Sequence, residues 1–280
     1  MPEDNTSDFS NSNTMENALK TYKNLYYKNV ENEEITSINL SSNIPSIRKI
    51  EGINDLVNLR HLDLCGNQIV KIEGLDNLTK LEILDLSSNY ITKLEGLENL
   101  TNLMELRLFD NQIEKIEGLQ KLKNLRILIF GDAFHLERGN YIEVIENLEN
   151  LTELEHLNLS MNEITEITGL ESLKDLERLE LTNNRITEIK GLENKPYLSD
   201  IDLLGNRIKV VKGLKDLRYL HDLNLLYNTI ESIESIDELK GISYLKIKIT
   251  NLPEEQKIIF HRYFLKNSWD HSYFSRKHVY

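Results

Sequence analysis

One sequence block recurs along most of this chain at a fixed interval. Residues 81–102 read LEILDLSSNYITKLEGLENLTN, and the next 22 residues read LMELRLFDNQIEKIEGLQKLKN, with leucine, asparagine, isoleucine and glycine at matching places. The asparagines of successive blocks are 22 residues apart except for one step of 29, and they stand at Asn67, Asn89, Asn111, Asn140, Asn162, Asn184, Asn206 and Asn228. A period of this length predicts a repeat architecture, in which each block packs only on its neighbours.

Each letter of the block has a physical reason. Leu84 and Leu86 alternate with Asp85, so a strand places both leucines on one face and the aspartate on the other. Such a strand is too short to be stable alone, and copies are expected to stack as a parallel sheet. The amide of Asn89 both donates and accepts, so a row of stacked asparagines satisfies backbone groups that turn inward. Gly96 marks a tight turn or a close approach.

The repeat frame divides the chain into segments. Residues 1–13 are rich in Asn, Ser, Asp and Thr and are expected to be a disordered tail. The apolar spacing of residues 14–34 predicts a helical cap on the open end of the first repeat. Residues 35–250 form the repeat domain, in which the long step predicts an insertion at 131–139. Residues 251–280 are expected to be a C-terminal helical cap and a tail that packs on the last repeat or binds a partner.

Composition narrows the class of protein. The net charge of −13 and the isoelectric point near 5.1 argue against nucleic acid and against an anionic membrane surface. Cys65 is the single cysteine, so no disulfide framework exists within the chain, and a reducing compartment is expected, cytoplasmic with the nucleus as an alternative. The sequence carries no phosphate-binding loop, nucleophile elbow or metal-binding motif, which predicts a protein that is not an enzyme and needs no cofactor or metal.

The residues that face outward from the predicted sheet are the candidate functional positions. Four acidic side chains gather within three neighbouring repeats: Glu180, Asp200, Asp202 and Asp222. Strands about 4.8 Å apart place these like charges close together, with Arg178 expected to compensate Asp200. Two interpretations remain open, a solvated acidic face and a docking surface for a basic partner.

Apolar side chains also occupy outward positions that the repeat does not require to be apolar. They are Ile83, Phe109, Ile127, Ile129 and Phe134 near the middle of the sheet, and Tyr227 and Tyr244 nearer its C-terminal end. Exposed apolar groups with aromatic anchors are typical of interaction sites. The alternative is that the insertion folds over Ile127 and Ile129 and buries them.

The phrases NQIVKIEGLDNLTKLEILDLSSN and NQIEKIEGLQKLKNL resemble the 22-residue leucine-rich repeat family typified by the leucine-rich regulatory subunit of protein phosphatase 1. The resemblance implies an α/β fold, a curved right-handed horseshoe with about ten parallel strands on its concave face. It also implies short helical or 3-10 convex segments and helical caps at both ends. In that family, aromatic and acidic side chains of the concave face hold the catalytic subunit. The positions that match in type and place are Phe109, Glu180, Asp202 and Tyr227.

The hypothesis from sequence is a scaffold, monomeric when unbound, that binds a partner protein through its concave face. The partner is a phosphatase catalytic subunit or another protein with a basic surface. The alternative is a structural component of a cytoskeletal or ciliary assembly that makes contact through the convex side or the C-terminal tail.

Overall fold

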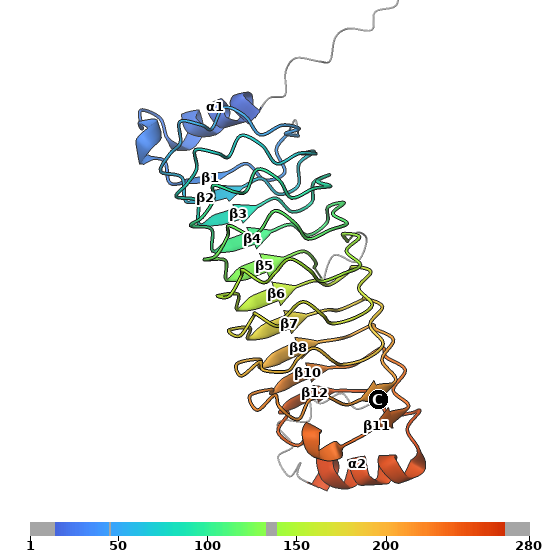
Figure 1. Ribbon diagram of the computed structural model, residues 1–280. Coiled ribbons are helices and arrows are strands. Elements are labelled where there is room, and N and C mark those ends of the chain that lie inside the picture. Colours follow the sequence, from blue (N-terminus) through green and yellow to red (C-terminus); the bar gives the residue numbers. More distant parts are fainter. Residues whose placement is uncertain (1–14, 45, 133–138, 267–280) are drawn as a thin grey trace, which may run out of the picture.

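The computed structural model describes residues 15–44, 46–132 and 139–266. Ten short strands lie side by side, in the order of the chain, in one parallel sheet (Figure 1). Two further strands, β9 Val210–Val211 and β11 Ser232–Ile233, form a separate pair. The strands of the sheet are β1 Ser37–Asn39, β2 His61–Asp63, β3 Ile83–Asp85, β4 Glu105–Arg107, β5 Ile127–Ile129, β6 His156–Asn158, β7 Arg178–Glu180, β8 Asp200–Asp202, β10 Asp222–Asn224 and β12 Tyr244–Lys246. This confirms the predicted solenoid of about ten parallel strands.

Every strand of the sheet buries its middle residue, while the first and third residues lie on the other face and are partly or fully exposed, except for the buried third residues Asn158 of β6 and Asn224 of β10. We call the surface formed by these outward side chains the concave face. The buried residues continue into one column of leucine and isoleucine that runs the length of the solenoid. The apolar residue that follows each strand was expected inside the strand but lies one residue beyond it. In the case of Leu64, its N–H still donates to the carbonyl oxygen of Asp85 in the next repeat.

The asparagine row confirms the role expected for Asn89. All eight repeat asparagines are buried. The side-chain oxygen of each accepts a backbone N–H from the preceding repeat, as in Ile91 N–H to Asn111 Oδ1 at 2.9 Å. The amide nitrogen of Asn111 donates to the carbonyl oxygens of Leu86 and Leu108. Each asparagine therefore joins two neighbouring coils through backbone groups that water cannot reach.

The insertion leaves the asparagine row intact. Asn140 lies beyond the insertion, yet it accepts from Ile113 N–H at 2.9 Å and donates to the carbonyl of Phe130 at 2.7 Å. Glycines stand at both ends of the inserted segment: a Cβ at Gly131 or Gly139 would lie 1.8 or 1.7 Å from a carbonyl oxygen of the next repeat. Only a residue without a side chain fits so close to a neighbouring backbone.

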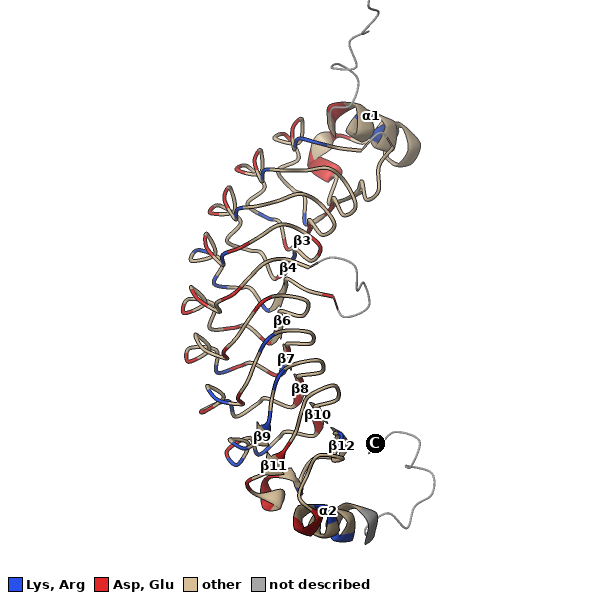
Figure 2. Ribbon diagram, turned by 90° about the vertical axis from the view of Figure 1, so that its right-hand side faces the viewer, with Lys and Arg blue, Asp and Glu red and all other residues tan. Residues whose placement is uncertain are grey.

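A helix covers each end of the solenoid. Helix α1, Met15–Tyr26, buries Met15 and Leu19 against the first repeat, and α2, Glu254–Lys266, lies at the other end (Figure 1). Phe260 of α2 is buried and Phe264 packs against the core, whereas Ile258 and Ile259 are exposed. The coil between the two helices is bowed into an arc (Figure 2).

The convex segments differ from the expected helical ones. Within the described repeats, most are turns, and the 3-10 helix Ile236–Leu239 is the helical exception. A second 3-10 helix, Asn32–Glu34, belongs to the N-terminal cap. Two short strands, β9 Val210–Val211 and β11 Ser232–Ile233, pair with each other away from the main sheet. Turns suffice because each segment is held by its asparagine and by the core leucines.

Candidate functional site

The central part of the concave face is less apolar than expected. Ile83 and Ile127 are half-buried, and Glu105 of β4 lies between them in the sheet register. Glu105 is ion-paired with Arg107, which lies beside Ile129. The predicted contiguous apolar surface is therefore interrupted by a charged pair. Phe134 and the covering role suggested for the insertion fall outside the described residues.

The aromatic positions differ in exposure. Phe109 is half-buried beside the asparagine row, and Tyr244 is half-buried on the last strand, β12. Tyr227 is 78% exposed, and its φ of 57° lies in the left-handed region. An aromatic ring this exposed, next to the sheet face, is suited to contact with another molecule.

The third residue of the strand has a structural role that the sequence analysis missed. In six repeats this residue is Asn or Asp, and its side-chain oxygen accepts the backbone N–H two residues later; these are Asn39, Asp63, Asp85, Asn158, Asp202 and Asn224. Asp202 also accepts from Thr182 and Asn224. Asp202 therefore ends its strand and has little capacity left for a partner. The signal in the sequence was the recurrence of Asn or Asp at the third strand position, because the side chains of these residues often accept the backbone N–H two residues later.

The acidic side chains gather as predicted at the C-terminal half of the concave face. A hollow of about 210 Å³ opens there, and it is lined by Arg178, Glu180, Asp200, Ile201, Asp202, Asp222, Leu223, Asn224, Tyr244 and Lys246. We call it the acidic hollow. Its floor is made of buried leucine and isoleucine, and its walls are the outward side chains of four neighbouring strands.

Glu180 is the compensated carboxylate of this group. Burial acts to raise the pKa of Glu180, but the adjacent His156 imidazole and Arg178 guanidinium outweigh it, and the pKa is lowered. Arg178 donates from Nε at 2.7 Å to Glu180, and His156 Nε2 lies 3.5 Å from it. The expectation that Arg178 would compensate Asp200 is wrong, because the guanidinium reaches along its own strand rather than across to the next one.

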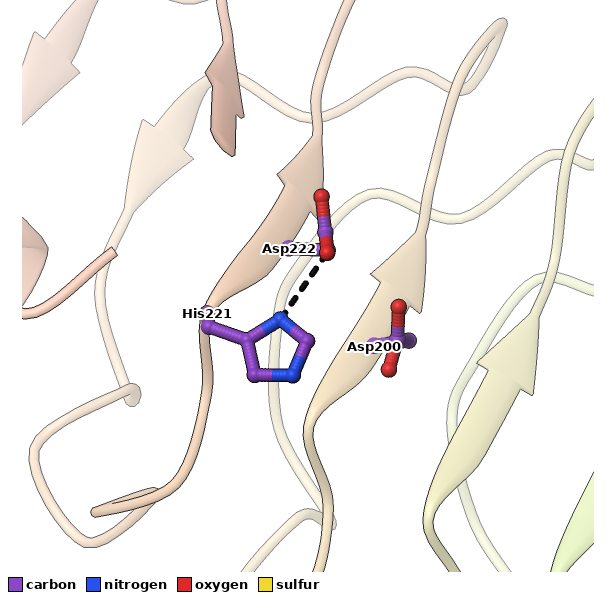
Figure 3. A group of neighbouring side chains, drawn as sticks. All are labelled: Asp200, His221 and Asp222. Atoms are coloured by element: carbon purple, nitrogen blue, oxygen red, sulfur yellow. Dashed lines mark hydrogen bonds and ion pairs between the residues drawn. The ribbon is translucent and has the colours of Figure 1, made fainter. Parts of the chain in front are cut away.

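His221 joins Asp200 and Asp222 in a cluster that the sequence analysis did not find. One ligand atom from each of the three lies within 4.8 Å of the others. The imidazole lies between the two carboxylates, and Nδ1 is 2.9 Å from Asp222 Oδ2 (Figure 3). The sequence offered a signal, because residues 22 apart are neighbours in register and His221 precedes one of two aspartates at this spacing.

Cys65 lies at the edge of the concave face, where it is partly buried. Burial and the carboxylates of Asp85 and Asp63 raise the pKa of this thiol to about 11. A thiol with such a pKa is almost wholly protonated near neutral pH, so it is a poor nucleophile.

Comparisons with known proteins place the fold. The family model described as Leucine Rich repeats (2 copies) matches residues 57–99 and 152–194. Among curated proteins no match was found. The matched segments and the parallel solenoid together define a leucine-rich-repeat fold.

Solved structures with the same fold include two internalins of Listeria monocytogenes. The inlF structure is 23% identical with a TM-score of 0.62, over 85% of this chain and 83% of that one. The inlC2 structure is 26% identical with a TM-score of 0.59, over 84% and 88%. A third, in the TLR13–ssRNA13 complex, is 21% identical with a TM-score of 0.60, and the match covers 79% of this chain and 37% of that one. None of the helices in the described ranges is both long and apolar enough to cross a membrane.

Proposed function

We propose that this chain is a non-catalytic scaffold that binds a partner protein through its concave face. The observations that carry the proposal are the outward side chains of the sheet, which form the acidic hollow, and the 78% exposed Tyr227 in the turn that follows β10. Aromatic anchors next to charged groups supply much of the binding energy at protein interfaces. The leucine-rich-repeat fold supports the same function, because its repeats expose a continuous curved surface.

The specific form of the proposal is a regulatory adaptor of a phosphatase catalytic subunit. Its support is the placement of Tyr227, half-buried Phe109 and the carboxylate of Glu180 on or beside one face. Asp202, the fourth residue that the family resemblance implies, contributes to the strand end instead. The contact would therefore rest on the first three residues, with Asp200 and Asp222 in place of Asp202.

The test compares binding of purified phosphatase-1 catalytic subunit, and capture of partners from lysate, between the wild type and a Phe109→Ala, Tyr227→Asn variant. Asparagine tolerates the positive φ of position 227, so the backbone is expected to keep its conformation. The matched control is Tyr219→Asn, which removes another exposed tyrosine outside the sheet.

If the first variant loses a partner that the control retains, the concave scaffold stands, and binding of the phosphatase decides its specific form. If both variants retain every partner and removal of residues 267–280 abolishes capture, the structural role through the tail replaces this proposal. Thermal unfolding of each variant checks that the fold is unchanged.

A further inference from the structure

The last helix of the chain has a packed side and an open side. Phe260 is buried and Phe264 packs against the core. Ile258 and Ile259 are instead 57% and 42% exposed. An α-helix turns by about 100° per residue, so Ile258 lies on the side of α2 opposite to Phe260. The exposed Arg262 lies one turn further on, next to Ile258. We call the surface formed by Ile258, Ile259 and Arg262 the outer face of α2.

The segments that adjoin the two end helices differ in composition. The outside of a terminal solenoid unit is expected to be polar, yet α1 also exposes two apolar side chains, Leu25 and Tyr26. Residues 1–14 contain one aromatic residue, Phe9. Residues 267–280, which lie beyond the described part of the chain, contain Trp269, Tyr273, Phe274 and Tyr280. The C-terminal segment therefore brings aromatic side chains to the end of α2 that the N-terminal segment does not bring to α1.

The C-terminal segment is long enough to return along α2. The helix ends at Lys266, and its rise of about 1.5 Å per residue puts Ile258 and Ile259 about 10–12 Å before that end. An extended chain covers about 3.3 Å per residue, so Tyr273 lies within about 23 Å of Lys266. A single reversal of the chain after α2 therefore lets Tyr273 reach both isoleucines. Asn267 stands at the place for this reversal, because asparagine tolerates the left-handed conformation that commonly ends a helix.

The chemistry of the outer face of α2 suits an aromatic side chain. An aromatic ring that packs on isoleucine removes a large apolar area from water. A guanidinium beside the same ring is attracted to its π-electrons, which makes Arg262 a favourable neighbour. An aliphatic side chain would gain the first contact but not the second.

We propose that residues 267–280 fold back along α2 and cover its outer face with aromatic side chains, which makes the C-terminal cap a two-layered unit. The inference goes beyond the proposed function, because it concerns the end of the solenoid and not the concave face. It predicts that Trp269, which lies between Lys266 and Tyr273 in the sequence, is shielded from water in the folded chain.

Trp269 supplies a direct probe, because it is the single tryptophan of the chain. Its emission maximum and its quenching by acrylamide therefore report on residues 267–280 alone. The test variant is Ile258→Gln, Ile259→Gln, which makes the outer face of α2 polar, while glutamine keeps a high helix propensity. We expect the wild-type quenching constant to be several-fold lower than in urea, and that of the variant to approach the urea value.

A second variant, Tyr273→Ser, Phe274→Ser, leaves α2 unchanged and should also expose Trp269 to acrylamide. The matched control is Leu25→Gln, Tyr26→Gln, which removes the exposed apolar pair of α1 and should leave the quenching of Trp269 as in the wild type. Circular dichroism and thermal unfolding check that each variant is folded.

Wild-type quenching equal to that in urea would overturn the proposal, and so would unchanged quenching in both the isoleucine and the aromatic variant. Shielding of Trp269 that is lost on dilution would assign the outer face of α2 to a second copy of the chain. Shielding that persists in the isoleucine variant but is lost in an Asp200→Asn, Asp222→Asn variant would place the segment on the concave face. Each of these last two results would also reject the two-layered cap.

Discussion

Lys195 occupies a place that the repeat reserves for leucine, and its replacement gives the sharpest test of the packing argument. The equivalent positions in neighbouring repeats are Leu173 and Leu217, both buried in the solenoid core. The side chain of Lys195 is 1% exposed, and Nζ donates to the carbonyl oxygen of Glu193 at 3.3 Å. Burial lowers the pKa of this ammonium, with Glu171 and Glu193 acting in the opposite direction.

The expected gain from Lys195→Leu follows from comparing the two side chains. Both place about four carbon atoms in the core, so the apolar burial hardly changes. The difference is the ammonium group of lysine. Burial removes its hydrating water, and a single long hydrogen bond compensates poorly, which costs about 1–3 kcal/mol of folding free energy. With an m-value of about 3 kcal/mol per M, the urea midpoint should rise by about 0.3–1 M.

The pH dependence gives a second readout with a defined sign. Because the folded-state pKa of Lys195 is below its unfolded value, the folded state binds fewer protons between the two, and the wild type gains stability as pH rises through that window. The advantage of Lys195→Leu should therefore be full near neutral pH and shrink as pH approaches about 10.4, the ordinary lysine value.

The assay is urea unfolding followed by circular dichroism at neutral and alkaline pH. The matched control is Lys174→Leu, the same chemical change at an exposed position of the preceding repeat, with an expected effect within about 0.5 kcal/mol. An unchanged or lower midpoint for Lys195→Leu would show that the ammonium is well solvated and that the argument from burial is wrong.

Three further predictions concern the repeat frame. Asn111→Ala leaves buried backbone groups without partners and should destabilise by about 2–5 kcal/mol in urea unfolding, whereas exposed Gln112→Ala should change little. Gly131→Ala forces a Cβ into a carbonyl oxygen at 1.8 Å and should lower the unfolding midpoint clearly, while Gly241→Ala, with no atom within 4 Å, should not; similar midpoints would contradict the close approach. Burial of the Cys65 thiol, with its pKa raised to about 11, predicts labelling by iodoacetamide at pH 7 far slower than in urea, and equal rates would refute it.

The fold was predictable because a single period fixes three things at once. It sets which residues alternate into the core, which asparagines align, and which residues become neighbours across strands, as the register of Asp200 with Asp222 shows. Each coil of the solenoid therefore builds its core from the same short pattern of residues. The strand ends were less certain, since the apolar residue after a strand, such as Leu64, keeps a ladder hydrogen bond outside the assigned strand.

The candidate site was only partly predictable, because period alone does not decide where a long side chain goes. Arg178 had two acidic neighbours, one two residues away along its strand and one across the sheet, and the structure pairs it with Glu180. Asp202 looked free for a partner but accepts backbone and side-chain hydrogen bonds. His221 was not considered from the sequence, although Asp200, which lies 22 positions before the adjacent Asp222, is its neighbour in space.

Asn140 continues the asparagine row across the insertion, so the packing of the coils does not depend on the inserted segment. Phe130 and Asn140 are joined by a direct hydrogen bond of 2.7 Å. Phe130 N–H also donates to Asn158 of the next coil, and Tyr141 N–H donates to Ile113 of the preceding coil. Because both flanks are fixed in this way, we expect that the length and sequence of the segment between them can be changed, or a foreign peptide inserted, without a change of register in the neighbouring coils. Engineering of this chain for a new ligand would therefore begin with the segment between Phe130 and Asn140.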